Sequence, residues 1–70
     1  MTVIRAPITG SVWRVLVARG DRVAEGDEIA IIESMKLEIP VEAEAHGTVR
    51  RVLVGDGDRI AEGQPMIELG

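Results

Sequence analysis

The sequence contains no cysteine, no phenylalanine and no tyrosine, and it has a single tryptophan. Without cysteine the chain can form neither a disulfide nor a thiolate metal site. Cysteine usage therefore does not indicate whether the protein resides in an oxidising or a reducing compartment. Without aromatic bulk, a core must be built from Val, Ile, Leu and Ala. Seventy residues form one small domain that buries only about 60% of its unfolded surface. We therefore expect a stability margin of roughly 3–5 kcal/mol.

Basic residues are also scarce, since 8 Lys and Arg stand against 12 Asp and Glu, for a net charge of −4. This balance argues against nucleic acids and anionic membrane surfaces as partners. No apolar run approaches the length of a membrane span, and no basic stretch followed by an apolar run opens the chain. We expect a soluble, cytoplasmic monomer that binds neither nucleic acid nor membrane.

Only one of the basic residues is a lysine, Lys36, which lies near the midpoint of the chain within Glu-Ser-Met-Lys-Leu-Glu at residues 33–38. A β-branched apolar run precedes this stretch, and residues 37–45 alternate strictly between apolar and polar. Such alternation is typical of a half-buried strand. The pattern predicts a hairpin of residues 28–33 and 37–45, with Met35 and Lys36 at its tip.

A two-residue loop fixes the register of this hairpin. The expected pairs are Ser34 with Leu37, Glu33 with Glu38, Ile32 with Ile39 and Ala30 with Val41, the last two pairs facing the core. Met-Lys is a poor loop sequence, because two-residue hairpin loops require positive φ and favour Asn-Gly or Asp-Gly. Glu33 opposite Glu38 also places like charges across a strand pair. Local rules broken in this way are expected at functional sites, although a solvated surface lysine would show the same spacing.

The sequence repeats itself on either side of the hairpin. Residues 10–26 align without a gap on residues 47–63, a shift of 37 positions, and the copies extend over 10–33 and 47–70. A unit this small cannot bury a face alone, so the copies should pack on each other about a pseudo-two-fold axis. Closely spaced Gly and Asp turn signals, and no sustained 3.6-residue period, predict an all-β sandwich or barrel. Lys36 should lie at one end and the termini at the other.

The stretch at residues 33–38 resembles the modification site of the biotinyl/lipoyl attachment family, in which a hairpin-tip lysine is joined to biotin through an amide. The resemblance covers the whole chain, including Ala6-Pro7 before Gly10 and Gly-Asp-x-Val/Ile-x-x-Gly turns at 20–26 and 57–63. It is strongest to small stand-alone members that carry Ser-Met-Lys-x-Glu-Ile-Pro. The resemblance implies a flattened eight-stranded barrel–sandwich hybrid with quasi-two-fold symmetry.

The same resemblance assigns the site residues. Lys36 would be the attachment residue, Met35 and Leu37 would be flanking recognition residues, and Glu33, Ser34 and Glu38 would contact the ligase. Members that carry biotin usually flank the lysine with Met, whereas lipoyl acceptors place Asp before it and Ala after it. Met35 therefore favours biotin, and Leu37, where Met is usual, is a conservative departure.

The function implied is that of a biotin carrier, not an enzyme. A biotin protein ligase would modify Lys36, and the biotinyl arm would carry an activated carboxylate between a biotin carboxylase and a carboxyltransferase, as in acyl-CoA carboxylases. Two alternatives stay open: a lipoyl carrier domain of a multi-enzyme complex, and an unmodified interaction module with the same fold. A start at Met1 and an end just past the second copy fit a free-standing protein.

The other motifs predict little chemistry. Arg-Gly-Asp at residues 19–21 and Asp-Gly-Asp at 56–58 occupy matching places in the two copies, so both are predicted to be turns. The second lacks the remaining ligands of a calcium loop. His46 has no catalytic partners in the sequence and is expected in a turn. Trp13 is expected to be a core or half-buried anchor, while its counterpart Arg50 indicates a face that is exposed in one copy. No catalytic or metal-ligating residue is predicted.

Overall fold

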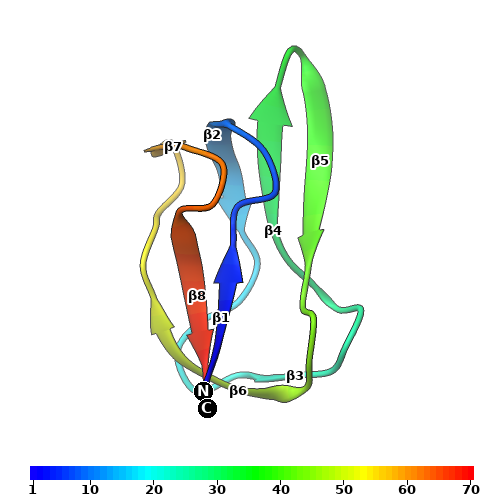
Figure 1. Cartoon of the computed structure of the whole chain (residues 1–70), viewed down its shortest axis with the longest axis vertical. Coiled ribbons are helices and arrows are strands. Elements are labelled where there is room, and N and C mark those ends of the chain that lie inside the picture. The colour runs from blue at the N-terminus through cyan, green and yellow to red at the C-terminus, as the bar shows by residue number, and fades with distance from the viewer.

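A computed structural model describes all 70 residues as β-strands and their connections (Figure 1). The strands are β1 (Thr2–Arg5), β2 (Gly10–Val15), β3 (Arg22–Val23), β4 (Glu28–Ser34), β5 (Leu37–Glu42), β6 (Gly47–Val52), β7 (Arg59–Ile60) and β8 (Pro65–Leu69). The structure contains no helix long and apolar enough to cross a membrane.

The strands form two four-stranded sheets, with the orders β1-β8-β6-β3 and β5-β4-β2-β7. A shift of 37 residues turns β2 into β6 and β3 into β7 with identical bounds. The same shift relates β1 to β5 and β4 to β8, so each strand of one sheet has its counterpart at the same place in the other. The predicted all-β fold with internal quasi-two-fold symmetry is confirmed.

Backbone hydrogen bonds lock the two copies together at equivalent places. The amide of Gly20, in the first copy, donates to the carbonyl of Val49 at 2.8 Å, and the amide of Gly57 donates to the carbonyl of Val12 at 2.7 Å. Both glycines have φ near 90°, a conformation that strains any residue with a Cβ. Each copy thus closes its turn on a strand of the other copy.

The core lies between the sheets and consists of 15 buried residues, all of them apolar. Apart from Met66, the buried residues are the Val, Ile, Leu and Ala that the composition predicts. The prediction that Trp13 is a core or half-buried anchor is wrong, because 46% of it is exposed. The β2–β4 register shifts between Val12 and Arg14, so Trp13 is the extra residue of a β-bulge. Its counterpart in the second copy, Arg50, was the signal that this position faces solvent.

The hairpin has the predicted register, with Ser34 opposite Leu37 and Ala30 opposite Val41. Ile39, expected on the core face, is only half-buried. The second strand is shorter than predicted and ends at Glu42 instead of residue 45. The chain turns away there because the amide and carbonyl of Ala43 bond to the turn at residues 26–27, at 2.8 and 2.9 Å.

The close approach of β2 to β4 predicts the effect of adding one methyl group at Gly10. A Cβ there would lie 2.5 Å from the carbonyl oxygen of Glu33 and 2.9 Å from Cγ2 of Ile32. Gly10→Ala should therefore lower the free energy of unfolding by about 1–3 kcal/mol, measured by urea denaturation. Gly55→Ala is the control: its nearest heavy atom is 3.9 Å away, and it should change stability by no more than about 0.5 kcal/mol. Equal stabilities of the two variants would contradict the packing argument.

Candidate functional site

The hairpin tip is the most unusual backbone segment of the chain. Met35 and Lys36, with φ of 52° and 64°, are the only non-glycine residues with positive φ. A two-residue hairpin loop of the type I′ class needs this conformation at both positions. An L-residue pays roughly 1–2 kcal/mol to adopt it. The strain that the sequence predicts at this turn is therefore present.

The two turn residues and Leu37 after them are exposed to solvent. Met35 is 91% exposed, Leu37 is 64% exposed, and Lys36 is also exposed. No side-chain hydrogen bond reaches the Lys36 amine, and the one ion pair of the structure joins Arg51 and Glu68 at the opposite end, at 3.9 Å. In Figure 1 the β4–β5 hairpin rises above the other strands, at the end opposite both termini.

The structure brings all six predicted site residues together at this tip. Glu33 pairs with Glu38 directly across the hairpin, and both side chains are exposed. Ser34, the last residue of β4, is half-buried below the turn. The single amine is thus carried by a short strained turn, with two carboxylates on the strands beneath it and an apolar side chain on either side.

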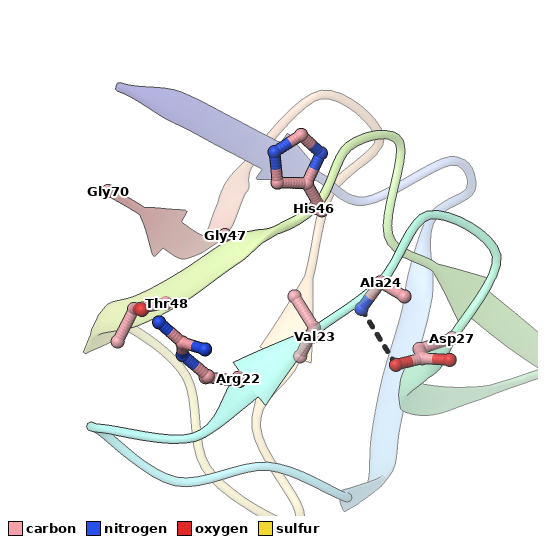
Figure 2. A pocket seen from close by; sticks show the side chains of 8 residues that line it. All are labelled: Arg22, Val23, Ala24, Asp27, His46, Gly47, Thr48 and Gly70. Carbon is pink, nitrogen blue, oxygen red and sulfur yellow. Dashed lines mark hydrogen bonds between the residues drawn. The ribbon is translucent and has the colours of Figure 1, made fainter.

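The surface depressions lie elsewhere. The one drawn in Figure 2 is at the terminal end of the molecule, and its lining residues are Arg22, Val23, Ala24, Asp27, His46, Gly47, Thr48 and Gly70. The Asp27 carboxylate accepts a hydrogen bond from the Ala24 amide at 2.8 Å. His46, predicted in a turn, lies just after the bend at residues 44–45, in the loop between β5 and β6. Its ring does not converge with the Asp27 side chain (Figure 2). The depression therefore assembles no catalytic pair.

The tip fits a covalently attached group and does not fit one held by a pocket. None of the three depressions is lined by Met35, Lys36 or Leu37. A group joined to the Lys36 amine would be held by its bond alone and would extend into solvent.

Comparison with known proteins agrees with this geometry. The family described as "Biotin-requiring enzyme" matches residues 2–69. The biotinylated protein TB7.3 homolog of Mycolicibacterium smegmatis is 52% identical over 40 residues, which are 57% of this chain and 56% of that protein. The biotin/lipoyl attachment protein of Bacillus subtilis is 49% identical over 37 residues, which are 53% of this chain and 51% of that protein.

Larger proteins match as well. A putative urea carboxylase of Emericella nidulans is 47% identical over 45 residues, 64% of this chain but only 4% of that protein. The crystal structure of the Kluyveromyces lactis urea carboxylase superposes with a TM-score of 0.92 at 33% identity, covering 99% of this chain and 6% of the carboxylase. The chain thus spans about half the length of the small relatives that it matches and 4–6% of the two carboxylases.

The strained turn predicts that Met35→Asn stabilises the protein. Asparagine tolerates positive φ better than methionine does, so the free energy of unfolding should rise by about 0.5–1 kcal/mol in urea denaturation. Leu37→Asn is the matched control, because Leu37 is similarly exposed but lies in β5 without positive φ. It should give no gain. A Met35→Asn variant no more stable than the parent would show that the turn stores no strain.

Proposed function

The chain belongs to the biotin/lipoyl attachment family of biotin-requiring enzymes, and on that basis we propose that it is a biotin carrier modified on Lys36. Biotin is the cofactor. The observation that carries the assignment to Lys36 is that the only lysine of the sequence occupies an exposed, strained hairpin tip and has no hydrogen-bond or ion-pair partner. Met35 before it, in place of Asp, favours biotin over lipoate.

The tip residues have different roles in the attachment of biotin. The Nζ atom of Lys36, as the free amine, would bond to the carboxyl carbon of biotin that the ligase has activated as an adenylate with ATP. The carbon–oxygen bond to AMP would break, AMP would leave, and the nitrogen would lose a proton. No side chain of this protein lies within hydrogen-bond distance of that nitrogen to accept the proton, so the ligase supplies the base and excludes water. Met35 and Leu37 offer the ligase apolar contacts on both sides of the amine, and Glu33, Ser34 and Glu38 offer polar ones. The turn presents all of these at once.

After attachment the protein acts as a carrier and not as an enzyme. When bound, biotin supplies the ureido ring on which an activated carboxylate travels between a biotin carboxylase and a carboxyltransferase. The chain holds the attachment point on two paired strands, and tethering raises the effective concentration of the arm at each partner. The residues around the tip position the group and leave the chemistry to the cofactor.

The proposal extends to the organisation of the protein. Residues 1–70 form one attachment domain, built from the copies at 10–33 and 47–70, and it acts as a monomer in the cytoplasm, where ATP for the ligase is available. Its partners are a biotin protein ligase, a biotin carboxylase and a carboxyltransferase.

Intact-mass spectrometry tests the proposal directly. Protein co-expressed with a biotin protein ligase and supplied with biotin should gain the mass of one biotinyl group, and Lys36→Arg should abolish the gain. Lys36→Arg combined with Arg59→Lys is the control, because it restores one exposed lysine away from the tip and should stay unmodified. A lipoyl mass increment would instead identify a lipoyl carrier, and an unchanged mass of the parent would identify an unmodified module.

A further inference from the structure

The two copies act as internal controls for each other, because the fold imposes the same demands at positions 37 residues apart. Residues that differ between equivalent positions are therefore not explained by the fold. The outer faces of the two sheets differ most clearly in this way, and the difference lies on the sheet that carries Lys36.

An apolar patch, formed by Trp13, Ile31 and Pro40, crosses the outer face of the β5-β4-β2-β7 sheet. Ile31 lies opposite Pro40 on one side and opposite Arg14 on the other, and the Arg14 guanidinium carbon lies 5.3 Å from the centre of the Trp13 ring. Ile31 faces outward, because both of its neighbours in β4 are fully buried and side chains alternate along a strand. Trp13 and Pro40 are exposed.

The equivalent face of the other sheet has a different character. The counterparts of Trp13, Ile31 and Pro40 are Arg50, Glu68 and Val3. There, Arg51 and Glu68 form an ion pair, where the hairpin sheet has Arg14 opposite Ile31. The fold therefore does not require the apolar patch.

Carboxylates flank the apolar patch at both ends of the β4–β5 pair, and on the β2 side the patch borders Arg14. Four exposed glutamates lie on β4 and β5, and their counterparts in the other half include no acid. The glutamates are Glu28, Glu33, Glu38 and Glu42, and the counterparts are Pro65, Gly70, Met1 and Arg5. A solvent-exposed tryptophan inside a charged rim is the arrangement of a protein-binding hot spot. A partner surface complementary to this one has an apolar centre that faces Trp13 and basic residues that face the glutamates. If a second copy of this chain bound through the same face, the glutamates of the two copies would lie close together. Repulsion between these like charges disfavours self-association through this face.

We propose that the apolar patch is the docking surface for the biotin protein ligase, an inference that rests on the proposed function. The ligase acts on the Lys36 amine and must therefore contact the tip. Enzymes that act on the ureido ring of attached biotin meet that ring at the far end of the biotinyl arm. Ile31 lies three residues below the end of β4, about 10 Å at roughly 3.3 Å per residue. A standard contact of about 800 Å² per partner, equivalent to a disc of about 16 Å radius, covers both the tip and the patch.

Steady-state ligation with purified biotin protein ligase, ATP and biotin tests this inference at varied carrier concentration. Trp13→Arg installs the residue that the same fold accepts at position 50, and Trp13→Ala removes the ring without adding charge. Each should raise KM for the carrier about tenfold and leave kcat unchanged, because Lys36 and its turn are intact. Arg50→Ala, on the equivalent position of the other sheet, is the control and should keep KM within twofold of the parent.

The outcomes separate this inference from the proposed function. If the parent is biotinylated and both Trp13 variants keep the parent KM, the patch is not the ligase surface. The inference is also overturned if the Trp13 variants are biotinylated normally and are defective only in the later transfer of the carboxylate. If the parent is never biotinylated, the proposed function itself fails. Urea denaturation checks that each variant is folded; should Trp13→Arg be unfolded, the result for Trp13→Ala decides.

Discussion

The exchange of short strands between the two halves of the chain is the constraint on which the structure depends. The two-residue strand β3 from the first half pairs with β6, and β7 from the second half pairs with β2. Both sheets therefore contain strands from both halves, and neither half can complete a sheet alone. In a chain of this size and without large aromatic residues in the core, this mutual closure turns two small apolar faces into one continuous core.

The symmetry also shows that the proposed attachment point, Lys36, is not repeated in the second copy. A shift of 37 residues carries most of the chain onto itself, but the same shift carries Lys36 past residue 70. The turn at the hairpin tip, residues 34–37, is thus without a counterpart. The first strand of the hairpin, β4, has seven residues where β8 has five. The added length lifts the turn clear of the shell and leaves the amine exposed.

Alternation and repetition in the sequence are enough to predict the hairpin and the architecture. A two-residue loop and a strictly alternating strand leave only one register that buries Ile32, and that register is observed. The core alternative for Trp13 was wrong even though alternation from the buried Val12 places Trp13 on the outer face. The β-bulge alters the order only beyond Trp13, where it lets Arg14 be exposed as well. A second register shift, before Ala30, lets two consecutive residues, Ile29 and Ala30, both be fully buried. Periodicity cannot show such insertions, although the charged counterpart of Trp13 gave an indirect sign.

The sequence at the tip follows from a conflict between turn stability and presentation. Asn-Gly would satisfy the positive φ of both positions, but it would remove the amine and the apolar side chain beside it. The strained Met35-Lys36 turn is retained because the paired strands below it, with Ile32 and Val41 in the core, hold the hairpin in place. The strain is therefore carried by core packing well below the turn. The position of the Lys36 backbone is thus set by the paired strands beneath the turn. A partner that acts on the Lys36 amine must reach this tip, and the sheet face formed by β4 and β5 is the surface directly beneath it.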